Sequence, residues 1–153
     1  MAERCIDANV AIKWFIKGEA FRRKALKLLR ESVAAGITLI APPLFESETD
    51  GIVQTRLVEG RTTPEAAERT FALLDSAPVL IVTHPRTRQR AREIARQCSQ
   101  RKVYDATYAA LAELRGCEFW TADKAFYDAV KGMLPFVKYL PDYPGGISLF
   151  VTT

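Results

Sequence analysis

Acidic side chains recur where the sequence pattern changes from a buried strand to a helix. Asp7 follows the first strand-like run, Asp105 opens a helical pattern, and Asp123 follows the strand-like run "EFWT". Glu46 and Glu48 both lie in the first turns of the helix expected after two prolines. In an open α/β sheet the carboxyl ends of the strands share one edge, where ligands bind. We therefore expect carboxylates from four segments to meet at that edge.

Each acid has two interpretations. Asp and Glu in the first turn of a helix are favoured by capping and by the helix dipole, so any one of them could be structural. Four carboxylates at one edge, however, repel and raise each other's pKa unless a cation compensates them. An oxygen-only set of ligands favours a hard ion such as Mg²⁺ or Mn²⁺. Such an ion polarises a phosphate ester and activates water, so the pattern favours phosphodiester hydrolysis.

Other chemistries find little support in the sequence. His84 is the only histidine, which excludes a histidine-based zinc centre and disfavours a Ser/His or Cys/His nucleophile. The chain has an odd number of cysteines, Cys5, Cys98 and Cys117, and no CxxC pair, so we expect neither a disulfide framework nor a zinc site. This use of cysteine favours a cytoplasmic location. Nucleotide-binding glycine motifs, a signal peptide and a membrane-spanning run are not expected either.

The elements that must position the acids alternate along the chain. Strands are expected at Arg4 to Ile6, Ile37 to Ile40, Val79 to Val82, Glu118 to Thr121 and, more weakly, Phe136 to Tyr139. Helices are expected at Glu19 to Ala35, Leu44 to Leu57, after the Thr63 cap up to Ser76, and at 104–115. This order predicts an α/β fold of three layers, α/β/α, with a mainly parallel sheet of about five strands.

The length predicts one domain. A chain of 153 residues, 48% of them hydrophobic and 26% charged, suits a single globular domain over 1–153. A short tail is expected from about residue 141, where the turn-rich "PDYPGG" leads into either an edge strand or a frayed end.

Positive charge is concentrated in one segment. The whole chain has a net charge of +4, but the stretch from His84 to Lys102 carries seven basic residues against Glu93 alone. Arg88, Arg92 and Arg96 repeat every four residues, as on one face of a helix. This face, with Arg86 before it, is either solvated or attracts the phosphates of a nucleic acid.

Four segments together resemble PIN domains of the VapC toxin type. They are "CIDANVAIKWF", "APPLFESETDGIVQTRL", "VYDATYAALAEL" and "FWTADKAF", in the family's order and spanning residues 5 to 126. The resemblance implies a PIN-like domain with Asp7, Glu48, Asp105 and Asp123 as the catalytic acids. Of these, Asp7, Asp105 and Asp123 would hold the metal, and Asn9 and Thr121 would be polar supports. Counting from the proline start of the family's helix favours Glu48 over Glu46 as the second acid.

The resemblance also implies a biological role. It predicts a Mg²⁺- or Mn²⁺-dependent endoribonuclease that cuts single-stranded or structured-loop RNA as the toxin of a toxin–antitoxin pair. A VapB-like antitoxin and a homodimer would be its partners, and Arg86, Arg88, Arg92 and Arg96 would guide the RNA. Four aromatic residues would then serve an interface or, as is commoner for aromatic residues at helical spacing, pack in the core: Trp14, Phe15, Phe21 and Phe71.

Two alternatives remain open at this point. "DAN" after a strand vaguely resembles the start of haloacid-dehalogenase-type phosphatases, with Asp7 as the nucleophile, although Asn9 stands where that class has a second Asp. The chain could also be a non-catalytic PIN-fold RNA-binding regulator. Asn9 itself is either a polar support of the site or the cap of the helix that follows Asp7.

Overall fold

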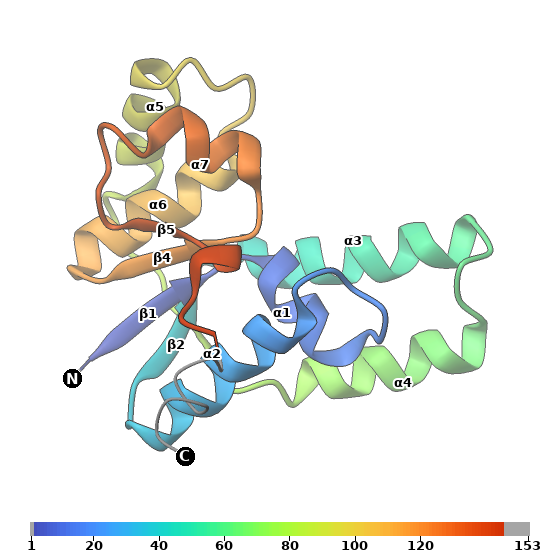
Figure 1. The fold of residues 1–153 in the computed structure, drawn as a ribbon. Coiled ribbons are helices and arrows are strands. Elements are labelled where there is room, and N and C mark those ends of the chain that lie inside the picture. The colour runs from blue at the N-terminus through green and yellow to red at the C-terminus, as the bar shows by residue number, and fades with distance from the viewer. Residues whose placement is uncertain (1, 146–153) are drawn as a thin grey trace.

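The computed structural model describes residues 2–145, and the ribbon in Figure 1 follows the chain from the N-terminus to the C-terminus. Within these residues the sheet has five strands: β1 (Glu3–Ile6), β2 (Thr38–Ala41), β3 (Val79–Ile81), β4 (Glu118–Thr121) and β5 (Val137–Tyr139). All neighbouring strands are parallel, in the order β3-β2-β1-β4-β5. The predicted α/β fold with a parallel sheet of about five strands is confirmed.

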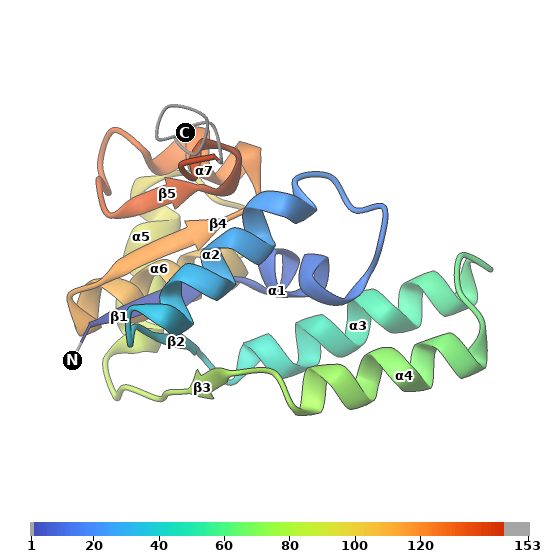
Figure 2. The same ribbon diagram turned by 60° about the horizontal axis from the view of Figure 1, so that its bottom comes forward.

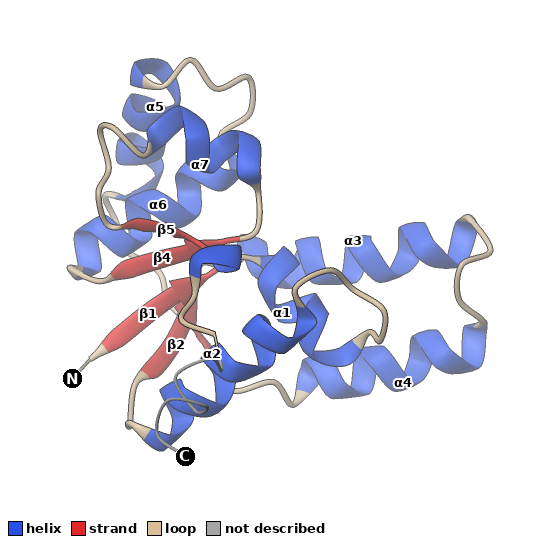
Figure 3. Cartoon of the chain, in the orientation of Figure 1, coloured by secondary structure: helices blue, strands red, loops and turns tan. Residues whose placement is uncertain are grey.

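Helices cover both faces of the sheet. They are α1 (Ala8–Phe15), α2 (Arg22–Ala34), α3 (Leu44–Val58), α4 (Pro64–Asp75), α5 (Thr87–Gln97), α6 (Tyr104–Arg115) and α7 (Lys124–Val130). Helices α5, α6 and α7 lie on one side of the strands, and α1 and α2 lie on the other (Figure 3). Helices α3 and α4 form an antiparallel hairpin that extends beyond the end of the sheet (Figure 2).

Local sequence signals fix several helix ends. The Thr63 hydroxyl accepts a hydrogen bond from the amide of Ala66 at 3.1 Å, and Pro64 occupies the first helical position, as predicted for α4. Gly116, with φ of 68°, ends α6 in the left-handed conformation that glycine adopts without strain. Helix α2 begins later than predicted, at Arg22, because Phe21 has a positive φ of 59°.

The core lies between the sheet and these helices. Tyr108 of α6 stacks on Phe119 of β4, with 5.5 Å between the ring centroids. Trp14 is buried, and its indole nitrogen donates to the carbonyl of Ala25 at 2.9 Å. Phe21 does not join the core, since 51% of its surface is exposed. The expectation of core packing is therefore confirmed for Trp14 and wrong for Phe21.

The end of the described chain packs on α2. A 3-10 turn, η1 (Leu140–Asp142), leads to Tyr143, which is buried and donates its hydroxyl to Glu31 at 2.7 Å. The predicted edge strand or frayed tail beyond this turn lies outside the described residues. Within residues 2–145, none of the helices has the length and apolar character needed to span a membrane.

Candidate active site

The predicted acids lie at one edge of the sheet. Strands β1 and β4 pair with Ile6 opposite Trp120, so the segments that follow them, which carry Asp7 and Asp123, leave the sheet side by side. A cleft of about 450 Å³ is lined by side chains that include Glu48, Asp105 and Asp123. Asp7 is only 2% exposed and does not line this cleft itself, but its charge acts on Asp105. The topology therefore brings together carboxylates that are up to 116 positions apart in the sequence.

Asp7 is held in place by three hydrogen bonds. Its Oδ1 accepts from the amide of Val10 at 2.9 Å, which makes Asp7 the N-cap of α1. Its Oδ2 accepts from the Thr121 hydroxyl at 2.7 Å and from the amide of Ala122 at 3.3 Å. Burial raises the pKa of Asp7 to about 6, although these three bonds favour the ionised form. Asp7 is thus a rigid, poorly solvated carboxyl.

Thr121 connects two of the acids. Its fully buried hydroxyl donates to Asp7 and accepts a hydrogen bond from the backbone amide of Asp123 at 3.0 Å. One hydroxyl can do both because it carries a donor and acceptor lone pairs. The predicted position of Thr121 beside the acids therefore has a geometric explanation, since it fixes the spacing between Asp7 and the backbone of Asp123.

Asp123 and Asp105 share the cleft. Asp123 caps α7 by accepting a hydrogen bond from the amide of Phe126 at 3.0 Å through Oδ1. Asp105 lies in the first turn of α6, and its pKa is raised to about 8. Burial is the largest cause, followed by a hydrogen bond with Asp123 and the negative charges of Asp7, Asp123 and Glu48. Asp105 is therefore the acid that holds a proton near neutral pH unless a cation replaces that proton.

Glu48, rather than Glu46, faces this cleft. The Tyr108 hydroxyl donates to Oε1 of Glu48 at 2.5 Å, and burial raises the pKa of Glu48 while this bond opposes the rise. Glu46 is exposed and lines a different hollow, together with Asp50. Sequence reasoning missed Tyr108 as a partner of Glu48. Its spacing of three residues from Asp105, which places both on one face of α6, was the available signal.

Asn9 is at the border between two hollows. Its side chain and that of Glu48 line both the acidic cleft and a neighbouring hollow of about 400 Å³. Asn9 is exposed and does not cap α1, because Asp7 does. Of the two interpretations of Asn9, capping is therefore wrong. Asp128, one turn into α7, is exposed and pairs with Lys124 at 2.5 Å, away from the cleft.

Basic side chains flank the acids unequally. In the neighbouring hollow Arg56 pairs with Glu19 at 2.7 Å, so its charge is largely compensated. On the other side Arg101 and Lys102 line the acidic cleft, and neither forms an ion pair within residues 2–145. An anionic ligand would therefore be attracted most strongly from the side of α5 and α6.

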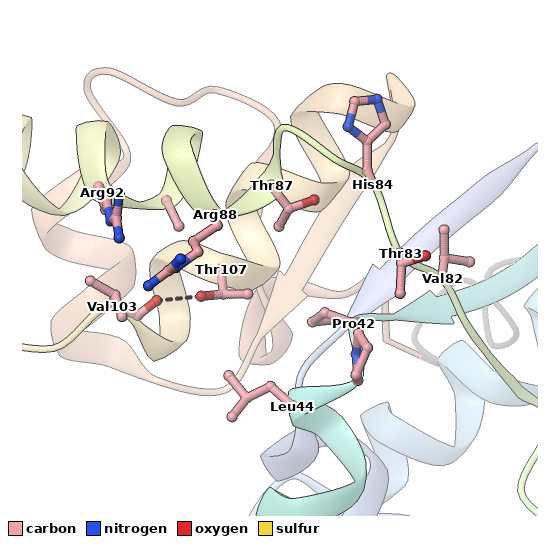
Figure 4. A pocket seen from close by; sticks show the side chains of 12 residues that line it. Pro42, Leu44, Val82, Thr83, His84, Thr87, Arg88, Arg92, Val103 and Thr107 are labelled. Atoms are coloured by element: carbon pink, nitrogen blue, oxygen red, sulfur yellow. Dashed lines mark hydrogen bonds between the residues drawn. The ribbon is translucent and has the colours of Figure 1, made fainter.

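The four arginines expected to guide RNA lie on or next to α5 and outside the acidic cleft. All four are exposed. Arg88 and Arg92 line a separate cavity, shown in Figure 4, whereas Arg86 and Arg96 are not part of that lining. Arg90, on the same helix, binds both carboxylate oxygens of Glu113 at 2.5 and 3.1 Å. The structure thus divides the basic face into a cavity-lining pair and a solvated remainder.

Comparisons with known proteins agree with this geometry. The sequence profile of the PIN domain family matches residues 4–132. The chain belongs to the PIN domain family. PIN domains are typically metal-dependent nucleases that act on RNA, so membership indicates nuclease activity in general. No curated protein matches the sequence.

A solved structure shares the fold of this PIN domain. The crystal structure of PAE2754 from Pyrobaculum aerophilum superposes with a TM-score of 0.64 at 18% sequence identity, covering 99% of this chain and 96% of that one. The likeness extends over nearly the whole length of both proteins. The phosphatase alternative is not favoured, and Asp7, almost fully buried with both oxygens hydrogen-bonded, is poorly placed as a nucleophile.

The donor chemistry of the acidic cleft fits a divalent cation. Among residues 2–145, no three His, Cys, Asp or Glu side chains already form a group arranged to hold a metal ion. The acids are instead held by internal hydrogen bonds, and Asp105 compensates repulsion by taking up a proton. Replacing that proton by a hard cation would satisfy the same carboxylates. The residues present therefore suit such an ion.

Proposed function

We propose that this PIN domain hydrolyses phosphodiester bonds of single-stranded or structured-loop RNA at the acidic cleft. The observation that carries the proposal is the convergence of Asp7, Glu48, Asp105 and Asp123 at one edge of the sheet, where burial and then the neighbouring carboxylates raise the pKa of Asp105 to about 8. Such strongly perturbed carboxyls in an open cleft are typical of functional sites. Family membership supports the same chemistry.

Asp7, Asp105 and Asp123 are proposed to hold Mg²⁺ or Mn²⁺. When bound, the ion would polarise the phosphate and lower the pKa of a water molecule. Asp7 and Asp123 are held in position because they cap α1 and α7, so their placement does not rely on flexible loops. Thr121 acts as a positioning residue, because its hydroxyl contacts the side chain of Asp7 and the backbone of Asp123.

Glu48 is proposed to orient the attacking water and accept its proton. The Tyr108 hydroxyl binds Oε1, which leaves Oε2 for the water. Burial raises the pKa of Glu48 above that of an ordinary glutamate, which makes it a better base while it stays ionised. Arg101 and Lys102 would attract the RNA backbone to the cleft. Asn9, at the border of the cleft, would contact the substrate or a bound water.

A cleavage assay tests the proposal. Purified protein should cut a fluorescent single-stranded RNA in the presence of Mg²⁺ or Mn²⁺, and excess chelator should stop it. The double variant Asp7→Asn, Asp123→Asn should be inactive, whereas Asp128→Asn, an exposed acid on α7 outside the cleft, should cleave like the wild type. Cleavage that continues in chelator or in the double variant would refute it. Tight RNA binding without any cleavage would instead support a non-catalytic regulator.

We infer that residues 1–153 form one PIN-like domain that acts in the cytoplasm as the toxin of a VapBC-type pair, as a homodimer inhibited by a VapB-like antitoxin. The resemblance of the four segments to VapC toxins supports this. Inducing the wild type in a host cell should arrest growth and create new RNA 5′ ends, and Asp7→Ala should do neither. Arrest that persists in Asp7→Ala would contradict a catalytic toxin.

A further inference from the structure

A second cavity opens next to the acidic cleft. It has a volume of about 400 Å³ and lies between the start of α3, the loop after β3, α5 and the start of α6 (Figure 4). One wall is apolar and includes Pro42, Leu44 and Val82, and Arg88 and Arg92 lie across the cavity from it. An apolar wall opposite two cations suits a ligand with a flat hydrophobic part and an anionic part.

Thr87 gives this cavity an unpaired polar group. Thr87 lines the cavity and is 9% exposed, yet its buried hydroxyl has no hydrogen-bond partner in the described part of the chain. Buried hydroxyls without a partner are rare, and each one calls for a ligand or an ordered water. A change of χ1 between staggered rotamers turns the hydroxyl to where the methyl group now lies. Thr87 can therefore offer a hydrogen bond to an occupant of the cavity.

Positive charge at this cavity is uncompensated. Arg88 and Arg92 are one helical turn apart, and neither forms an ion pair within residues 2–145, whereas Arg90 is bound to Glu113. The N-terminus of α5, an eleven-residue helix, has no side-chain cap. Free guanidinium groups and an uncapped helix N-terminus both attract a phosphate. These features accompany the unpaired hydroxyl of Thr87 on the same helix.

The cavity and the acidic cleft share two helices. Leu44, in the cavity, is one turn before Glu48 on α3, which corresponds to about 6 Å along the helix. At the start of α6, the N-cap residue Val103 and the helical Thr107, both in the cavity, flank Asp105 in sequence. The cavity and the acids are therefore neighbours along both helices.

We propose that this cavity is a nucleotide subsite for single-stranded RNA. The base lies against the apolar wall of Pro42, Leu44 and Val82, the phosphate lies between Arg88 and Arg92, and Thr87 hydrogen-bonds the nucleotide. The occupied nucleotide is the neighbour of the one whose phosphodiester bond is cut, and this assignment rests on the proposed nuclease function. The subsite, and not the whole basic face of α5, then sets which RNA positions are bound.

Nucleotide binding without cleavage tests the subsite. The full chain in excess chelator is titrated with AMP, UMP, adenosine and inorganic phosphate, and amide NMR resonances are followed. AMP or UMP should move the resonances of residues 87–92 and bind at least about tenfold more tightly than phosphate or adenosine alone. Double substitution Arg88→Gln, Arg92→Gln should weaken binding about tenfold or more, while Arg96→Gln, on the same helix but outside the cavity, should not.

Two further variants separate the possible outcomes. Thr87→Val keeps the shape of the side chain, so it should weaken nucleotide binding several-fold without lowering the melting temperature of the free protein. Equal weakening by Arg96→Gln, equal affinity for phosphate alone, or no saturable nucleotide binding would overturn the subsite. If the wild type cleaves no RNA, the proposed function is refuted, but the titration still shows whether the cavity binds a nucleotide. If the Arg88→Gln, Arg92→Gln variant cleaves RNA with the KM of the wild type, the subsite is refuted while the proposed nuclease function stands.

Discussion

Replacing Asp105 by asparagine should stabilise the metal-free protein at alkaline pH. Folding raises the pKa of Asp105 from 3.8 to about 8, so the folded protein binds more protons than the unfolded chain between these values. Stability therefore falls as the pH rises through this window, and the loss is complete above about pH 8. Asparagine cannot ionise and can still donate a hydrogen bond to Asp123.

The magnitude follows from the size of this window. A carboxyl whose pKa rises from 3.8 to about 8 on folding costs up to about 6 kcal/mol once it is ionised. Asp105 is only partly buried, so water screens much of this, and we expect about 2–3 kcal/mol. For a chain of this length that corresponds to roughly 5–10 °C in melting temperature. Near pH 5 the gain should be clearly smaller.

Thermal unfolding in chelator at about pH 5.5 and about pH 8.5 measures this effect. Asp50→Asn, an exposed acid on α3 away from the cleft, is the matched control and should change little at either pH. If Asp105→Asn is no more stable than the wild type at the higher pH, burial and the neighbouring carboxylates do not penalise ionised Asp105 as argued. A cation at ten times its Kd should stabilise the wild type by about 1.4 kcal/mol and the variant less. Equal stabilisation of both would place the cation elsewhere.

Four other substitutions test the acidic cleft and helix α3. Tyr108→Phe removes the hydrogen bond to Glu48, which should lower the free energy of unfolding by about 1.5–3 kcal/mol. Loss of this bond should also raise the pKa of Glu48, so the acidic limb of the pH–rate profile should move to higher pH. Glu48→Gln should reduce cleavage by about 100-fold or more, whereas Glu46→Gln should leave it within about twofold, and equal losses in the same assay would contradict the choice of Glu48. Gly51→Ala should raise the free energy of unfolding by about 0.5–1 kcal/mol, because a Cβ there meets nothing within 4 Å in the interior of α3, and urea unfolding measures this.

The order of elements was readable from the sequence because each one has a local signal. The spans predicted for α6 and β4 match the structure, and those for α3 and α4 are within one residue of it. The start of α2 was wrong because helical spacing says nothing of the positive φ of Phe21. The positions of the charged residues along the elements were also predictable. Individual side-chain contacts between elements that are distant in the sequence were not. Tyr108 binds Glu48 across sixty positions, and the cavity at Thr87 is built from four segments.

The sequence left helix capping and a functional role as alternatives for each acid. For Asp7 and Asp123 the two roles are not exclusive. Each caps a helix through Oδ1, and Asp123 also lines the cleft, while Asp7 is hydrogen-bonded to Thr121 beside it. Asp105 and Glu48 cap nothing, and burial raises the pKa of both. Removing an N-cap costs about 1 kcal/mol, so losses at Asp7 or Asp123 combine structural and catalytic effects. Asp105 and Glu48 are therefore the positions at which activity can be removed while the helices that build the cleft stay in place.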